Sequence, residues 1–263
     1  MDLQNKVVLV TGGSGGLGEQ LCYEAAKQGA IVIVCARRIN LIGKVKEQCE
    51  MLSGKTAYAF QLDVAQPDSV AAMLEKVQSE VGSVDILINN AGFGVFEDFV
   101  TFDMATAYQM FEVNVLGMMV LTQKIALMML EAGKSGNIVN IASMAGKMAT
   151  PKTAVYSATK FAVLGFSNAL RLELKPAGIQ VMTVNPGPIA TNFFEKADPS
   201  GNYLSDLGNL VLEPEDLAKV IIKGIRKGKR EINRPRLMQA ASQFYTLFPK
   251  IGDLLAGGIF NQK

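Results

Sequence analysis

The sequence predicts an α/β fold with one doubly wound parallel sheet and helices on both of its faces. Short, continuously apolar runs rich in Val and Ile alternate with longer segments of helical periodicity along most of the chain. Strands that are apolar on both faces are typical of parallel sheets, because helices cover each side of such a sheet. No Ser-, Gly- or Pro-rich linker interrupts the alternation, so we expect a single domain over residues 1–263.

The predicted elements follow one another in strict alternation. The expected strands lie at residues 6–10, 31–35, 56–62, 84–89, 137–142, 179–184 and, as a short last strand, 231–233. The expected helices lie at residues 17–28, 41–52, 67–81, 103–131, 155–174 and 215–227. Start and stop residues support these boundaries: Gly29 follows the first helix, and Pro67 and Pro214 open later ones. Two segments lie outside the pattern, the polar stretch 187–213 and the apolar tail 237–263.

Composition excludes several classes of function. Lys and Arg number 26 against 24 Asp and Glu, and the net charge of +2 gives no electrostatic basis for binding nucleic acid. The chain contains no histidine. This absence excludes Ser-His-Asp hydrolysis and His-ligated zinc catalysis, and we expect no metal site. Proton transfer must therefore use Tyr, Lys, Asp, Glu, Ser or water.

Cysteine usage and the N-terminus indicate the compartment. Cys22, Cys35 and Cys49 form no C-x-x-C pair and are odd in number, which fits buried thiols in a reducing compartment. The N-terminus lacks the pattern of a signal peptide, and no stretch approaches the roughly 20 apolar residues of a membrane span. We expect a cytoplasmic protein without a transmembrane segment.

A glycine-rich loop, Thr11–Gly18, lies between the first strand and the first helix. A loop of this kind gives a tight turn and a close backbone approach to a pyrophosphate, and the helix that follows offers free N–H groups to the phosphates. The loop also matches the G-x-S-x-G pattern of serine hydrolases, but the chain has no histidine base for that chemistry. The cofactor-binding candidates in this loop are Gly12, Ser14, Gly15, Gly16, Leu17 and Gly18.

Two arginines follow the second predicted strand. A site for NAD places an acid at the end of this strand, whereas a site for NADP places a cation there for the 2′-phosphate. The residues here are Ala36, Arg37 and Arg38, so the sequence predicts NADP(H). Arg37 is the stronger candidate, because it is nearer the strand end. The alternative is a pair of solvated arginines at a helix start, an arrangement that the helix dipole disfavours.

Tyr156 and Lys160 lie four residues apart on one face of a predicted helix. A free phenol has a pKa of about 10, and a neighbouring ammonium lowers it, so the pair can perform acid–base chemistry without histidine. Ser143 follows the fifth strand, and the run Asn89–Gly92 ends the fourth. Both therefore lie at the carboxyl edge of the sheet, where ligands bind. Asn114 interrupts a long helix as a poor helix former.

With these motifs, in this order and spacing, the chain resembles the short-chain dehydrogenase/reductase family, of the NADP-preferring type, over about residues 5–235. The matching motifs are Thr11–Gly18, Asp63-Val64, Asn89–Gly92, Asn114, Ser143, Tyr156 with Lys160, and Pro186-Gly187. The resemblance implies a Rossmann-type sheet of seven strands. It further implies a homodimer or homotetramer, held by the helices predicted at 103–131 and 155–174.

The resemblance also implies a role for each catalytic candidate. Tyr156 would be the general acid in reduction, and Lys160 would lower its pKa and bind the nicotinamide ribose. Ser143 would orient the substrate oxygen, and Asn114 would hold a water in a proton relay. The remaining cofactor contacts would be Asp63 and Val64 at the adenine, Asn90, Ala91 and Gly92 along the adenosine, Pro186, Gly187 and Thr191 near the nicotinamide, and Ile189.

The expected function is an NADP(H)-dependent oxidoreductase that transfers a hydride between nicotinamide and a carbonyl or alcohol, acting as a carbonyl reductase on an apolar small molecule. The alternatives are a 3-oxoacyl-thioester reductase of lipid synthesis and a non-catalytic NADP sensor. Residues 187–213 are the expected substrate lid, and its aromatic residues are Phe193, Phe194 and Tyr203. The residues Gly94, Val95 and Phe96 and the segment 144–152 are further candidates for the pocket wall.

The tail 237–263 is apolar and departs from the shortest family members. Three interpretations stay open. The tail could pack on a neighbouring subunit, cover the pocket, or lie on a membrane surface as a peripheral contact. Gly257 and Gly258 are expected to weaken any helix there.

Overall fold

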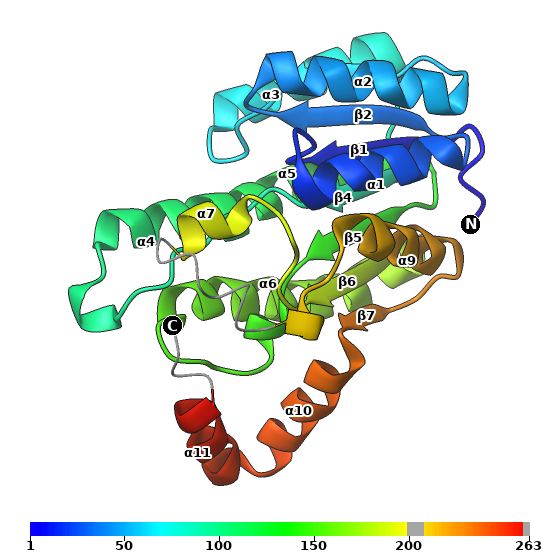
Figure 1. Cartoon of the computed structure of the whole chain (residues 1–263). Coiled ribbons are helices and arrows are strands. Elements are labelled where there is room, and N and C mark those ends of the chain that lie inside the picture. Colours follow the sequence, from blue (N-terminus) through cyan, green and yellow to red (C-terminus); the bar gives the residue numbers. More distant parts are fainter. Residues whose placement is uncertain (199–207, 260–263) are drawn as a thin grey trace.

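The computed structural model describes residues 1–198 and 208–259. Its centre is one parallel sheet of seven strands, as predicted, and the strand order is β3-β2-β1-β4-β5-β6-β7 (Figure 1). The strands are β1 (Val7–Thr11), β2 (Ile31–Ala36), β3 (Tyr58–Gln61), β4 (Ile86–Asn89), β5 (Asn137–Ile141), β6 (Gln180–Pro186) and β7 (Glu231–Arg234). The chain direction of the crossovers reverses between β1 and β4, which creates a crevice at the carboxyl ends of these two strands.

Helices connect the strands. The α-helices are α1 (Gly16–Lys27), α2 (Ile39–Ser53), α3 (Pro67–Lys76), α4 (Met104–Phe111), α5 (Met118–Glu131), α6 (Ala154–Leu174), α7 (Phe193–Ala197), α9 (Pro214–Arg226), α10 (Arg236–Leu247) and α11 (Pro249–Ile259). The π-helical segments are η1 (Val77–Val81) and η3 (Glu112–Gly117), and the 3₁₀ turns are η2 (Phe99–Thr101), η4 (Met144–Gly146), η5 (Lys175–Ala177) and η6 (Gly208–Leu210). The short helix α7 lies in the segment expected to be irregular.

Alternate strand residues build two cores, one on each face of the sheet. Val8 and Val10 of β1 pack with α1, α2 and α9, whereas Val7 and Leu9 pack with α3, α5 and α6. The strands are apolar throughout because both of their faces are covered. The three cysteines are buried in these cores, and burial raises the pKa of Cys49 to about 12, which leaves it as a thiol.

The helix predicted at 103–131 is continuous and contains a π-helical segment. Asp103 caps its start, because its carboxylate accepts from the N–H groups of Ala105 at 3.1 Å and Thr106 at 3.0 Å. Asn114 lies in the π-helical segment η3, which the sequence did not predict. By length and hydropathy Met104–Glu131 could cross a membrane, but half of its most apolar window is buried inside the fold. It therefore packs here as a core helix.

The C-terminal tail folds into two helices, and α11 runs to Ile259, across Gly257 and Gly258. Glycine lowers helix propensity by about 1 kcal/mol, which disfavours a helix without preventing it. Figure 1 shows α10 leaving the end of β7 and α11 turning back beside it, away from the sheet. The exposed apolar side chains of this pair include Leu247, Phe248, Ile251, Leu254 and Leu255.

Candidate active site

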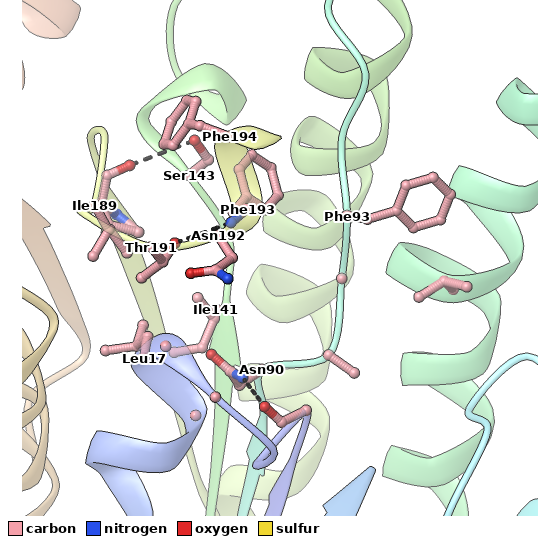
Figure 2. A pocket seen from close by; sticks show the side chains of 18 of the residues that line it. Leu17, Asn90, Phe93, Ile141, Ser143, Ile189, Thr191, Asn192, Phe193 and Phe194 are labelled. Carbon is pink, nitrogen blue, oxygen red and sulfur yellow. Dashed lines mark hydrogen bonds between the residues drawn. The ribbon is translucent and has the colours of Figure 1, made fainter. Parts of the chain in front are cut away.

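A cleft of about 820 Å³ opens at the carboxyl edge of the sheet, over the crevice between β1 and β4. Figure 2 shows the glycine-rich loop with Leu17 and Asn90 at one end of this cleft, and Ser143, Phe193 and Phe194 at the other. Every cofactor-binding candidate predicted from the sequence lines the cleft. These residues are Gly12, Ser14, Gly15, Gly16, Leu17, Gly18, Arg37, Arg38, Asp63, Val64, Asn90, Ala91, Gly92, Tyr156, Lys160, Pro186, Gly187, Ile189 and Thr191.

The glycine-rich loop is built for close backbone approach. Gly12 has a φ of +68°, a conformation that a side chain disfavours. A Cβ atom on Gly18 would lie only 2.3 Å from the carbonyl oxygen of Gly12, so α1 can pack against the loop only with glycine there. At Gly15 a Cβ atom would meet only Arg38 Nη2, at 3.8 Å, and the loop therefore faces open space at the start of α1. This cradle fits the pyrophosphate of a dinucleotide.

Thr11 joins the ends of β1 and β4, which the sequence analysis did not anticipate. Its hydroxyl oxygen accepts from the backbone N–H groups of Asn90 and Ala91, both at 3.0 Å. The side-chain amide of Asn90 donates in return to the carbonyl oxygen of Thr11 at 3.0 Å (Figure 2). These bonds fix the segment after β4 along the cleft floor.

The two arginines lie at the glycine-loop end of the cleft and are exposed. Arg38 Nη2 donates to Ser14 Oγ at 2.8 Å and so reaches across to the loop. The carbonyl oxygen of Arg37 accepts from Gln61 Nε2 at 3.0 Å, which ties the end of β2 to β3. Both arginines line this end of the cleft, and the Arg38 guanidinium reaches the glycine-rich loop, where an anionic group of a bound cofactor would meet positive charge.

Tyr156 and Lys160 face the cleft from the first turns of α6. The Tyr156 ring lies between Phe96 and Phe193, at centroid distances of 5.6 Å and 5.8 Å. Lys160 Nζ lies 5.7 Å from the centre of the Tyr156 ring and donates to the carbonyl oxygen of Ile141 at 3.0 Å. Lys160 is only 6% exposed, and burial lowers its pKa to about 8.

Ser143 lies directly after β5, opposite the first turns of α6. Its Oγ accepts from the N–H of Ala145 at 3.1 Å and donates to the carbonyl oxygen of Pro186 at 3.4 Å (Figure 2). The hydroxyl is thereby held between the ends of β5 and β6. Ser143, Tyr156 and Lys160, which come from two elements, line one cleft together.

Asn114 is the one catalytic candidate that is not among the described residues lining the cleft. Its side-chain oxygen accepts from the N–H of Phe93 at 3.0 Å, and its amide donates to the Phe93 carbonyl oxygen at 2.8 Å and to Thr159 Oγ1 at 3.2 Å. A Cβ atom on Gly92 would lie 3.0 Å from Asn114 Oδ1 and 3.7 Å from Lys160 Nζ. Asn114 thus holds the backbone at Phe93, next to Gly92 and Lys160, without lining the cleft itself.

Only some of the residues predicted to form the wall of the substrate pocket line the cleft. Phe96, Phe193 and Phe194 line the cleft, as do several residues of the segment 144–152. Gly94 and Val95 are not among the described lining residues, although a Cβ atom on Gly94 would lie 2.8 Å from Tyr156 Cδ2. Tyr203 lies outside the described residues.

A comparison with known protein families identifies the family of this chain. The model of the short-chain dehydrogenase family matches residues 6–201. The chain belongs to the short-chain dehydrogenase family. Members of this family are oxidoreductases whose fold binds a nicotinamide cofactor and a substrate. In this chain the glycine cradle and the Tyr156–Lys160 pair line one cleft.

Three relatives illustrate the range of the family. The NADP-dependent 3-hydroxy acid dehydrogenase of Schizosaccharomyces pombe is 32% identical over 225 residues, which cover 84% of this chain and 86% of that protein. A short-chain dehydrogenase of Sphingobium yanoikuyae, solved with NADPH, has a TM-score of 0.80 at 26% identity and covers 95% of each chain. The 3-ketoacyl-(acyl-carrier-protein) reductase of Brucella melitensis, solved with NADH, has a TM-score of 0.80 at 29% identity and covers 88% of this chain and 97% of that one.

Proposed function

We propose that this short-chain dehydrogenase is an NADPH-dependent carbonyl reductase of apolar small molecules. The observation that carries the proposal is that Ser143, Tyr156 and Lys160 line the same cleft as the glycine cradle and two arginines. One end of the cleft fits a dinucleotide, and the other presents a hydroxyl, a phenol and an amine to a substrate oxygen.

The chain's own groups would hold the substrate oxygen and move the proton. The bound cofactor supplies the hydride to the carbonyl carbon. Ser143 Oγ donates a hydrogen bond to the carbonyl oxygen, and the Tyr156 hydroxyl transfers its proton to that oxygen as the alcohol forms. The ammonium of Lys160 favours the phenolate that Tyr156 becomes. We propose that Asn114, through its hold on Phe93, supports a water that returns the proton.

The proposal of NADP(H) rests on charge at the mouth of the cleft. Ala36 stands where an NAD site places an acid, and Arg37 and Arg38 follow it. Arg38 extends to Ser14 in the glycine-rich loop, so the position between the loop and β2 carries positive charge. Relatives of this chain have been solved with either cofactor form, so the family alone leaves the choice open.

The apolar substrate class rests on the other end of the cleft. Phe96 and Phe193 flank the Tyr156 ring there, and Phe194, Met144 and Met148 also line the cleft. Apart from the Tyr156–Lys160 pair, the ionisable side chain among the described lining residues at this end is Glu195. A substrate carboxylate would meet no cation there other than Lys160, which donates to the Ile141 carbonyl oxygen, and so would lack a cation of its own in an apolar site.

The second candidate is a 3-oxoacyl-thioester reductase, which the likeness to the Brucella melitensis enzyme favours. Both candidates share the reaction at the carbonyl and differ in what is attached to it. A comparison of free ketones with 3-oxoacyl thioesters of equal chain length distinguishes them. A kcat/KM that is higher for the thioester by tenfold or more would favour the second candidate.

The test of the proposed function is a screen for carbonyl-dependent oxidation of NADPH, with methyl 4-acetylbenzoate and 4-acetylbenzoate as a matched neutral and anionic pair. We expect turnover of the neutral ester and a much lower kcat/KM for the acid. Tyr156→Phe is the control, because it keeps the cleft and removes the proton donor. Preference for the acid would contradict the apolar class, and undiminished turnover by Tyr156→Phe would contradict the mechanism.

We also propose that the chain assembles as a homodimer or homotetramer through the outer faces of α4, α5 and α6. Exposed apolar side chains gather on these helices and on η3 between α4 and α5, namely Tyr108, Leu116, Leu127, Leu130, Phe161 and Leu172. Pairing of these faces would bury them. Sedimentation should show a multiple of the 28.3 kDa chain and a smaller species for Phe161→Asp. A monomeric wild-type protein would contradict the proposal.

A further inference from the structure

Met238 belongs to the C-terminal tail, yet it lines the cleft together with the catalytic residues. It lies in the first turn of α10, directly after β7 ends at Arg234. Its neighbour Leu237 is 67% exposed, so adjacent residues of this turn have opposite environments. The tail therefore contributes one side chain to the site, although the rest of α10 and α11 extends away from the sheet (Figure 1).

Backbone contacts fix Met238 in this position. The N–H of Gly187 donates to the carbonyl oxygen of Arg234 at 2.6 Å, which joins the end of β6 to the start of α10. A Cβ atom on Gly187 would lie 2.7 Å from Met238 Sδ and 3.0 Å from Pro235 Cδ, so the thioether packs directly on that glycine. α10 also packs against η4, the turn that follows Ser143, and Met238 and Ser143 line the same cleft.

Met238 thus lies at the substrate end of the cleft. The arginines border the opposite end, at the glycine-rich loop, and Gly187 follows β6 beside Pro186, whose carbonyl oxygen accepts from Ser143. A methionine here adds an unbranched apolar wall that can adapt to the group it contacts. Met144 and Met148 give the same character to the segment after Ser143.

We infer that Met238 is a specificity-determining residue, which limits the size of the apolar group attached to the substrate carbonyl. The inference rests on the proposed carbonyl reductase function. It concerns a part of the chain beyond residues 6–201, which the family model matches. Among the interpretations of the tail, it assigns to the first turn of α10 the role of covering the pocket.

The experiment compares two single-residue truncations in the full chain, Met238→Ala and its exposed neighbour Leu237→Ala. Each variant is assayed with NADPH and a series of methyl ketones of increasing chain length, and the readout is the ratio of kcat/KM for a long ketone to that for a short one. Met238→Ala should raise this ratio about tenfold, because it removes apolar contacts from short substrates and makes room for long ones. Leu237→Ala should leave the ratio unchanged.

A third variant makes the inference falsifiable even if the truncation disturbs folding. Met238→Phe enlarges the side chain and should lower the same ratio, and NADPH binding by fluorescence checks that each variant keeps its cofactor site. A ratio in Met238→Ala and Met238→Phe equal to that of Leu237→Ala would overturn the inference while leaving the proposed function intact. A wild-type protein that reduces no ketone would instead contradict the proposed function.

Discussion

The buried ammonium of Lys160 should lower the free energy of unfolding of the cofactor-free protein at neutral pH. Burial lowers its pKa from 10.5 to about 8. That difference corresponds to a penalty of roughly 3 kcal/mol for keeping the ammonium charged in the folded protein. Lys160→Met keeps the length of the side chain and removes the charge, but it also removes the charged hydrogen bond to the Ile141 carbonyl oxygen, worth about 2 kcal/mol. The net expectation is a stabilisation of about 1 kcal/mol, or roughly 3 °C in Tm.

The pH dependence follows from the direction of the pKa change. Below about pH 8 Lys160 is protonated in both the folded and the unfolded chain, so the full penalty is present. Between about pH 8 and pH 10.5 the folded state has released the proton that the unfolded state still holds, and wild-type stability rises with pH. The advantage of Lys160→Met should therefore shrink over this window and be lost above it.

Thermal unfolding of the cofactor-free protein from pH 7 to pH 10 tests this reasoning, with Lys44→Met, an exposed lysine on α2, as the matched control. Saturating NADPH should raise the Tm of wild type more than that of Lys160→Met, because only wild type offers the ammonium to the cofactor. A lower Tm for Lys160→Met than for wild type at pH 7 without cofactor would refute the argument. So would an advantage that persists unchanged at pH 10.

Three further substitutions test separate parts of the site. Tyr156→Phe should lower kcat by at least about 100-fold while NADPH still binds, as measured by turnover and by fluorescence titration. Arg38→Asp should reduce the NADPH/NADH ratio of kcat/KM more than Arg37→Asp does, because Arg38 is the arginine that contacts the glycine-rich loop; the reverse order would return the phosphate contact to Arg37. Gly94→Ala should lower kcat about tenfold, since its methyl group would lie 2.8 Å from Tyr156 and 3.0 Å from Phe193 and displace the phenol; unchanged kcat would show that the two rings adjust.

The alternation of apolar runs and helical segments was enough to predict the sheet, because a parallel strand must be apolar on both faces. The glycine-rich loop and the Tyr156–Lys160 pair could also be predicted from the sequence, because both depend on local spacing. A tight turn needs glycine at fixed positions, and two residues share one helical face when they are four apart. The placement of these motifs at one edge of the sheet followed from the common direction of the strands.

Contacts between distant segments were decided only by the tertiary structure. The sequence favoured Arg37 because it is nearer the strand end, whereas the bond from Arg38 to Ser14 arises only because the loop and the end of β2 are brought together. Asn114 was identified from its poor helix propensity, but its bonds to Phe93 and Thr159 depend on how η3 packs against α6. In the sequence Met238 is one of many apolar residues in the tail. Its place in the cleft depends on β7, which positions the first turn of α10 against Gly187. Local sequence determined which residues could perform the chemistry, whereas long-range packing decided which of them meet, because such contacts depend on the path of the whole chain.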